Sequence, residues 1–256
     1  MRKVYCFLFF ILIGFSVNCS SGKRPADSKV KILVLTERGG HHRGFTTVAL
    51  KWLEEYVKEK NFEMTEINNT SFINEDFLAD YDVFLQLDFP PYTWSNESKA
   101  AFEKYIEEGK GGWIGFHHAS LLGEFDGYQM WQWFSGYLGG IRFRNYIAET
   151  ATGTLHVEDS IHPVMKNVKT SFSVADDEWY IFDRNPRPNV HVLANVDESS
   201  YQPSSDVKMG DHPVIWVNEK VKARNVYFLM GHHASLFDNE DFKTMFGNAI
   251  MWAAGK

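Results

Sequence analysis

The sequence predicts an α/β protein with a doubly wound, mostly parallel sheet and helices on both faces of that sheet. Apolar runs of strand length alternate with helical patterns over residues 30–116, in the order β-α-β-α-β-α-β. Three histidine pairs each follow a predicted strand. Because open sheets of this class bind ligands at the carboxyl ends of their strands, the pairs mark a candidate site. We therefore expect one domain over residues 30–256, with its site at that edge.

The first half of the chain supplies the regular alternation. Strands are predicted at 30–35, 62–67, 82–87 and 111–116, and helices at 45–58, 75–79 and 95–108. The run at 30–35 is mostly apolar, which is typical of a central parallel strand, whereas 62–67 alternates weakly and suits a position nearer an edge. Ser95 is placed to cap the third helix and Gly109 to end it.

The second half of the chain is less regular. A short helix is predicted within 128–137, extended chain at 142–157, and strands at 190–196, 214–217 and 226–230. A turn-rich loop is expected at 201–210, between two of these strands. The last helix is expected to begin at a cap formed by Asp238. Its apolar stripe consists of Phe242, Met245, Phe246, Ala249, Ile250 and Ala253.

Composition excludes some classes of partner. The chain has 256 residues and a net charge of −7, without a basic cluster beyond its first residues, so a nucleic-acid partner is not expected. It has no phosphate-binding loop and no dinucleotide fingerprint, so no nucleotide cofactor is expected. Aromatic residues make up 16% of the chain. Most aromatic residues pack in cores, but some can form a platform for the apolar face of a sugar. The oligomeric state does not follow from the sequence.

The amino terminus is typical of an export signal. Arg2 and Lys3 precede the apolar run Val4–Val17, which is shorter than the roughly 20 residues that span a bilayer. The residues that follow resemble a bacterial lipoprotein processing site, with lipid attached at Cys19; ordinary cleavage nearby is the alternative. The expected segments are a signal peptide at 1–19, a polar tether at 20–29 and the folded domain at 30–256. We therefore expect an exported protein on the periplasmic side of the cell envelope, either soluble or anchored to the membrane.

The histidine pairs indicate the chemistry of the site. The pentapeptide His-His-Ala-Ser-Leu occurs at residues 117–121 and again at 232–236, and His41 and His42 follow the first strand. Neutral imidazole is a common ligand of zinc, and the ligands of a catalytic metal come from separate strand ends with one position left open. One histidine from each pair, with a carboxylate such as Glu178, meets this need. A divalent metal such as zinc is therefore a candidate cofactor, with the candidate ligands His42, His118 and His232.

Other interpretations of these histidines remain open. Their spacing matches no zinc motif, and a histidine can also bind substrate directly or donate to a carbonyl. The acidic triplet at 176–178 precedes Trp179 and Tyr180, so it is either a source of a general base or metal ligand, or a solvated turn. The candidate catalytic residues are His117, His118, Glu178 and His232. The candidate substrate-binding residues are His42, Trp133, Arg144, Tyr180 and His233. The histidines expected to be structural are His156, His162, His191 and His212.

The chain resembles the trehalose-utilisation, ThuA-like proteins from about residue 30 to residue 254. The resemblance is carried by His42, the segment 112–119, Trp133 with Gly139-Gly140, His162-Pro163, Asp177-Glu178 with Tyr180, Pro213 with Trp216, Gly231-His232 and Ile250-Met251-Trp252. It implies a flavodoxin-like fold of the class I glutamine amidotransferase type. In that fold a nucleophilic cysteine follows the strand that corresponds to 113–116, whereas this chain has His117 there and only Cys6 and Cys19 as cysteines. Glutamine amidotransferase chemistry is therefore not expected.

The resemblance also implies a role in carbohydrate metabolism, linked to disaccharides oxidised to 3-keto sugars. We therefore expect an exported protein that acts on a glycoside or a 3-keto sugar, as an isomerase, lyase or hydrolase. Its small carbohydrate substrate would lose a proton beside a carbonyl, or a glycosidic bond would break by elimination or hydrolysis. A carbohydrate-binding lipoprotein without catalysis, and an accessory protein of a sugar-utilisation complex, are the alternatives.

Overall fold

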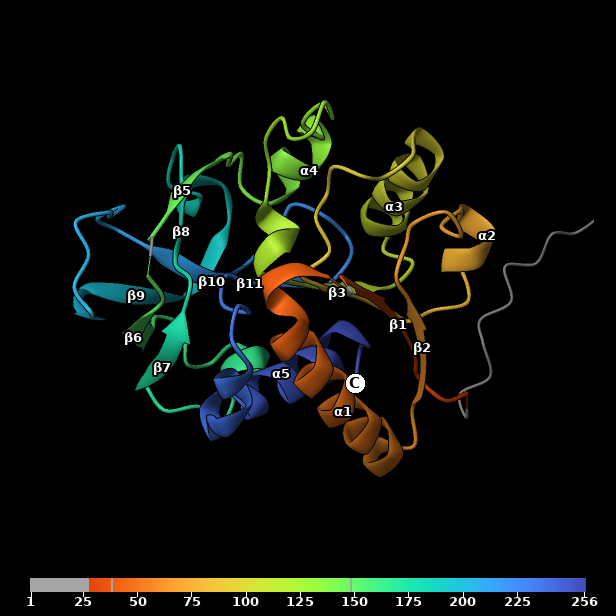
Figure 1. Cartoon of the computed structure of the whole chain (residues 1–256). Helices are drawn as coiled ribbons and strands as arrows, with labels where there is room; N and C mark the ends of the chain where they lie inside the picture. The colour runs from red at the N-terminus through yellow and green to blue at the C-terminus, as the bar shows by residue number, and fades with distance from the viewer. Residues whose placement is uncertain (1–27, 38, 148) are drawn as a thin grey trace, which may run out of the picture.

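The computed structural model describes residues 28–37, 39–147 and 149–256 (Figure 1). The predicted signal peptide, Cys19 and most of the predicted tether lie outside these residues. Within the described ranges, no helix combines the length and the apolar character needed to cross a membrane.

A nine-stranded mixed sheet organises the chain, in the order β2-β1-β3-β4-β11-β10-β9-β6-β7. Its strands are β1 (Lys31–Thr36), β2 (Glu63–Ile67), β3 (Val83–Leu87), β4 (Gly112–Phe116), β6 (Ala151–Val157), β7 (Ser171–Asp177), β9 (His191–Gln202), β10 (Pro213–Val217) and β11 (Asn225–Phe228). Neighbours from β2 to β11 pair in parallel, and those from β11 to β7 pair antiparallel. A separate antiparallel pair consists of β5 (Phe143–Tyr146) and β8 (Tyr180–Phe182).

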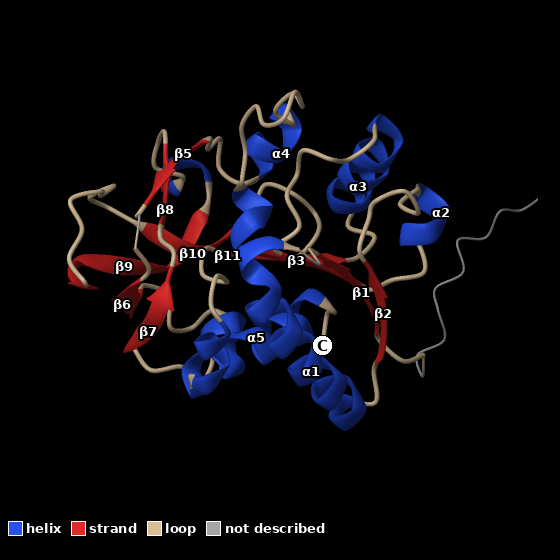
Figure 2. Cartoon of the chain, in the orientation of Figure 1, coloured by secondary structure: helices blue, strands red, loops and turns tan. Residues whose placement is uncertain are grey.

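Helices cover both faces of the sheet, as predicted (Figure 2). The α-helices are α1 (Arg43–Lys60), α2 (Glu75–Leu78), α3 (Asn96–Glu108), α4 (Gln132–Tyr137) and α5 (Glu240–Ala253). Short 3-10 turns are η1 (Gly40–His42), η2 (His117–Ser120), η3 (Pro163–Met165), η4 (Arg187–Asn189) and η5 (Ala234–Asp238). Helices α1 and α5 lie on one face, and α2, α3 and α4 lie on the other (Figure 1).

Burial follows the apolar pattern of the strands. Every residue of β3 and β4 is buried, and so is all of β1 except its first residue, because these strands are covered by helices on both faces. Strand β2 alternates between exposed and half-buried positions, since it forms the edge that its sequence predicts. The doubly wound α/β class is thus confirmed. The antiparallel half extends the sheet beyond the alternation that the sequence shows.

Helix boundaries confirm one predicted cap and correct another. The Ser95 hydroxyl accepts a hydrogen bond from the amide of Ser98, and α3 ends at Gly109, whose φ is 68°. The last helix is capped by Asn239, whose side chain accepts from the amide of Phe242 at 3.1 Å, so the prediction of Asp238 is wrong. Asp238 is instead the last residue of η5, because the chain makes a further turn before α5 begins.

Strand β9 is longer than predicted. It continues to Gln202, which pairs with Thr152 of β6, so the expected loop at 201–210 begins two residues late. The second half of the strand reads Asp-Glu-Ser-Ser-Tyr-Gln. Its polar composition hides the strand from a search for apolar runs, and only pairing with β6 makes it extended.

Candidate functional site

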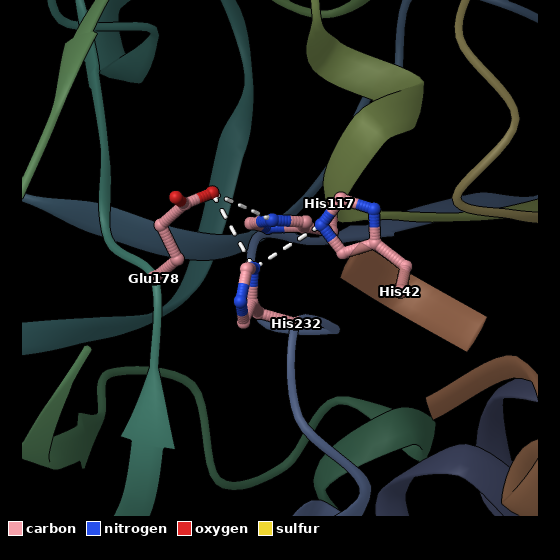
Figure 3. A group of neighbouring side chains, drawn as sticks. All are labelled: His42, His117, Glu178 and His232. Carbon is pink, nitrogen blue, oxygen red and sulfur yellow. Dashed lines mark hydrogen bonds and ion pairs between the residues drawn. The ribbon is translucent and has the colours of Figure 1, made fainter. Parts of the chain in front are cut away.

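Three histidines from distant segments meet at the carboxyl end of the parallel strands (Figure 3). His42 ends η1, His117 directly follows β4, and His232 lies beyond β11, which pairs with β4. His42 Nε2 lies 3.1 Å from His232 Nδ1, although the two residues are 190 positions apart. The ring of His118 joins them, with its centroid 3.9 Å from that of His42. We call these four residues the histidine cluster.

Glu178 approaches the cluster from the antiparallel half of the molecule. It lies between β7 and β8, and its Oε2 is 3.2 Å from His117 Nε2 and 3.5 Å from His232 Nδ1 (Figure 3). Burial alone would raise the pKa of Glu178, but the two imidazoles lower it well below its usual range. Glu178 is therefore an ionised carboxylate directed at two imidazoles.

His117 is held rigidly at the end of β4. Its side chain is fully buried, and Nδ1 donates to the carbonyl of Leu229 at 2.8 Å. The hydroxyl of Tyr227 donates to the His117 carbonyl at 3.0 Å, and the backbone of His117 is left-handed, with a φ of 38°. Burial lowers the pKa of its imidazole to about 3, so His117 is neutral at ordinary pH.

Glu37 is a site residue that the sequence interpretation missed. Its Oε2 accepts from His118 Nδ1 at 2.7 Å and lies 3.5 Å from His42 Nδ1. Although burial opposes it, contact with these two imidazoles lowers the pKa of Glu37 to about 2. Glu37 immediately follows β1, so its position at a strand end was the signal that could have identified it.

Two further buried carboxyl groups lie beneath the cluster. Asp177, at the end of β7, accepts from the amides of Glu178 at 2.9 Å and Gly231 at 3.2 Å. Burial raises its pKa to about 7. Asp88 follows β3, is fully buried, and its pKa is raised well above the usual value for the same reason. The interpretation of the acidic triplet as a solvated turn is therefore wrong for buried Asp177, and Asp176, although exposed, is part of β7.

A cavity of about 640 Å³ opens over the cluster. Its lining consists of Glu37, Gly40, His41, His42, His118, Leu121, Phe143, Tyr146, Thr150, Glu178, Tyr180 and His232. Carboxylates and imidazoles form one part of this surface, and Phe143, Tyr146 and Tyr180 form an aromatic part. The ring of Tyr180 also stacks on His117, with centroids 4.1 Å apart. The volume is that of a small-molecule site.

Two sets of side chains are close enough to share a metal ion. In each set the ligand atoms all lie within 4.8 Å of one another. The first set is His42, His117, Glu178 and His232, and the second is Glu37, His42 and His118. The second set is already joined by the short hydrogen bond from His118 to Glu37, so it needs no ion to hold it.

Three predicted substrate-binding residues lie outside the lining of the cavity. Trp133 donates its indole N–H to Glu107 at 2.7 Å, and Arg144 is exposed on β5. His233 is exposed and accepts from the amide of Ser235, which caps η5. Their positions do not support the predicted roles. Tyr180 and His42 do line the cavity. The four histidines expected to be structural, His156, His162, His191 and His212, do not line it.

The fold and the site together define a class. The sheet carries a sharp turn after β4, and that turn holds His117 and His118 of the histidine cluster. A glutaminase domain of the Trypanosoma brucei CTPS with bound acivicin shares the fold, with 10% identity, a TM-score of 0.52, and coverage of 89% of this chain and 94% of that one. The chain is therefore an α/β protein of flavodoxin-like fold with a histidine-rich site.

Comparison with known families identifies the chain more closely. The model of the ThuA family, described as trehalose utilisation, matches residues 31–253, so the chain belongs to the ThuA family. A putative ThuA-like protein from Bacteroides uniformis is 27% identical, with a TM-score of 0.78 over 90% of this chain and 94% of its own. One from Parabacteroides merdae shares 20% identity and the fold, with a TM-score of 0.67 over 90% and 91%. No curated protein matches significantly. Family membership points to a carbohydrate-related function.

Proposed function

We propose that the protein is an enzyme that acts on a glycoside or a 3-keto sugar in the cavity over the histidine cluster. The observation that carries this proposal is the pairing of acid-base groups with an aromatic wall around one cavity of about 640 Å³. Phe143, Tyr146 and Tyr180 offer flat apolar surface, which suits the C–H face of a sugar ring. The imidazoles and carboxylates face the same space, so a bound sugar would contact both.

His118 is the group best arranged to accept a proton. Its Nδ1 donates to the ionised Glu37 at 2.7 Å, which leaves Nε2 as the basic nitrogen of the ring. This is the arrangement of a general base oriented by a carboxylate. Glu37 thus acts as a positioning residue, since it fixes both the tautomer and the plane of the imidazole.

The remaining members of the cluster can stabilise negative charge. When His118 takes a proton from the carbon beside a sugar carbonyl, the electron pair of that C–H bond moves onto the carbonyl oxygen. Burial lowers the pKa of His232, but the Glu178 carboxylate outweighs it and the net effect raises that pKa. The ring N–H of His232 that does not face Glu178 would donate to the developing oxyanion. Reprotonation at another carbon gives isomerisation, and loss of the group β to the carbonyl gives elimination.

Incubation with matched sugars tests this proposal. The protein should convert a 3-keto disaccharide, or exchange the hydrogen beside its carbonyl in deuterated water, and should do so faster than with the unoxidised disaccharide. His118→Ala should lower the rate by about 10²- to 10⁴-fold while circular dichroism stays unchanged. Specific binding without product over a long incubation would instead favour a non-catalytic carbohydrate-binding protein.

We also propose that the chain is exported and carries lipid at Cys19. The support is the order of basic, apolar and small polar residues in the first part of the sequence. In a bacterial host, labelled fatty acid should be incorporated into the full chain and not into Cys19→Ala. Label in neither, with the protein soluble in the periplasm, would indicate ordinary signal cleavage.

A further inference from the structure

We propose that the floor of the cavity is a binding site for one divalent metal ion of the zinc type. Its ligands would be His42 Nε2, His117 Nε2, His232 Nδ1 and Glu178 Oε2. The proposal deepens the proposed function, on which it rests only in using the same cavity. Binding of the ion does not depend on which substrate the protein takes.

Three of the six distances among the four donor atoms fit an ion of this size, and all six are within 4.8 Å. Bonds of about 2.0–2.1 Å at tetrahedral angles place neighbouring donors about 3.3 Å apart. His117 Nε2 lies 3.2 Å from Glu178 Oε2, and His232 Nδ1 lies 3.5 Å from the same oxygen. His42 Nε2 lies 3.1 Å from His232 Nδ1. The three measured edges therefore bracket the expected value, and Figure 3 shows the side chains converging on one space.

Proton positions at His117 favour a cation there. A carbonyl oxygen only accepts hydrogen bonds, so the bond to Leu229 O places the proton of His117 on Nδ1. In the neutral ring Nε2 then carries a lone pair, and that lone pair faces the carboxylate oxygen of Glu178 at 3.2 Å. Two acceptors at this distance repel unless a cation lies between them or the ring is protonated. Full burial of His117 opposes protonation of the ring.

The groups behind the ligands have the character expected around a metal. Metal-bound histidines donate their second ring nitrogen to a carboxylate or a backbone carbonyl, which fixes the tautomer. His117 does this through Leu229 O at 2.8 Å. The Nδ1 of His42 lies 3.5 Å from the carboxylate of Glu37. The hydrogen bond to Leu229 O fixes the tautomer of His117, and Glu37 lies on the Nδ1 side of His42, so in both rings Nε2 is the atom directed at the proposed ion.

The donor set selects the type of metal. Three imidazole nitrogens and one carboxylate oxygen suit zinc and its transition-metal neighbours, whereas magnesium prefers oxygen ligands and water. His232 and Glu178 are only half-buried and line the cavity, so a further ligand can approach the ion from that side. An ion bound there would supply Lewis acidity to a substrate carbonyl.

A metal titration of the whole protein tests the site. Protein treated with a chelator and dialysed is titrated calorimetrically with zinc chloride, and separately with magnesium chloride. We expect one zinc ion per chain and no comparable binding of magnesium. Bound cobalt(II) should give an intense visible absorption band, which is typical of an ion with four or five ligands. Weak zinc binding without a defined stoichiometry, or a cobalt spectrum like that of the hydrated ion, would overturn the proposal.

Matched variants locate the ion. Glu178→Gln keeps the shape of the side chain, and His232→Ala alters a half-buried residue, so both should fold. Substitution of a residue that only hydrogen-bonds to a metal ligand weakens metal binding by roughly 10- to 100-fold. Each of these two variants removes a ligand and should weaken zinc binding by more than that. His233→Asn, in the neighbouring histidine outside the cavity, should leave the affinity unchanged. Equal affinity in all three variants would place the zinc elsewhere and remove the site.

The outcomes separate this proposal from the proposed function. Zinc bound at the cluster without turnover of any sugar would leave the metal site standing and contradict the enzymatic proposal. Turnover that is unchanged in chelator-treated protein, with no zinc bound at the cluster, would support the enzymatic proposal and contradict the metal site.

Discussion

The same pentapeptide, His-His-Ala-Ser-Leu, folds in two different ways in this protein. At residues 117–121 it starts directly after β4, and η2 begins at its first histidine. At 232–236 three residues separate it from the end of β11, and η5 begins only at Ala234. The residue before each turn has the same backbone, with φ and ψ of −121° and 143° at Phe116 and −120° and 144° at His233. The turn therefore begins two residues later within the second copy.

This shift decides which imidazoles reach the site. In the first copy both histidines lie within the turn, and their rings stack at an interplanar angle of 4° in the cluster. In the second copy the pair lies just before the turn, and His232 joins the cluster while exposed His233 caps η5. In an extended chain, successive side chains point to opposite sides, so only one of His232 and His233 can face the cavity. The strand end, and not the motif, determines the role of each histidine.

The largest difference between the two copies is expected at their second histidines, His118 and His233. His118→Ala should lower turnover of a keto sugar by about 10²- to 10⁴-fold, because it removes the proposed base. His233→Ala should change it by far less, since that side chain lies outside the cavity. Steady-state kinetics on both variants, with circular dichroism as a check of folding, makes the comparison. Equal losses would mean that the two copies are functionally alike.

Titration of the first histidines should also separate the copies. In metal-free protein His117 should stay neutral down to a pH of about 3, because burial lowers its pKa from 6.5. His232 should titrate above 6.5, because its contact with Glu178 outweighs burial. These shifts have opposite effects on the free energy of unfolding. His117 lowers it as pH falls from 6.5 towards 3, because the unfolded chain binds a proton that the folded chain does not. His232 raises it below pH 6.5, and this contribution is lost as pH rises through its folded pKa. Histidine NMR signals followed from pH 3 to 9 measure both, and parallel curves would contradict the assignment.

Gly231, which directly precedes the second copy, packs against His117 of the first. A Cβ atom there would lie 2.9 Å from His117 Cβ and 3.1 Å from Asp88 Oδ1, and its φ is 153°. Gly231→Ala should therefore lower the free energy of unfolding by about 1–3 kcal/mol. Urea denaturation measures the loss. Gly136→Ala, at an exposed helical position with open space around it, should be neutral or stabilising.

The smallest expected difference between the copies is in the stability that their serines contribute. Ser120 is fully buried, accepts from Tyr227 at 2.6 Å and donates to the His117 carbonyl at 3.0 Å. Ser120→Ala should cost about 1–2 kcal/mol, since a buried hydroxyl loses its partner. Ser235 is half-exposed, so Ser235→Ala should stay within about 0.5 kcal/mol. The same urea experiment compares them, and a larger loss at Ser235 would reverse the interpretation.

Much of the parallel half was predictable because its physical signals are local. Continuous apolar runs marked β1, β3 and β4, and parallel strands must end at one edge, so the histidine pairs were expected to meet there. The meeting of His42, His117, His118 and His232 agrees with that expectation, while their roles stay predictions.

Other features depend on partners that the local sequence does not reveal. The extension of β9 is set by β6, and the burial of Asp177 by amides of Glu178 and Gly231. The different fates of His118 and His233 could not follow from identical pentapeptides. Glu37 follows a strand, but a single carboxylate at such a position is also common on solvated loops, so its position alone was a weak signal, and its contact with His118 makes it a site residue.

The contact between His42 and His232 has a consequence for biosynthesis. Because it joins residues 190 positions apart, a growing polypeptide has no assembled pocket until most of its length has been synthesised. Helix α1 can form early, but His42 cannot make this contact until the segment after β11 has been synthesised. A chain that ends before β11 would therefore lack both His232 and the strand that joins the parallel half of the sheet to its antiparallel half.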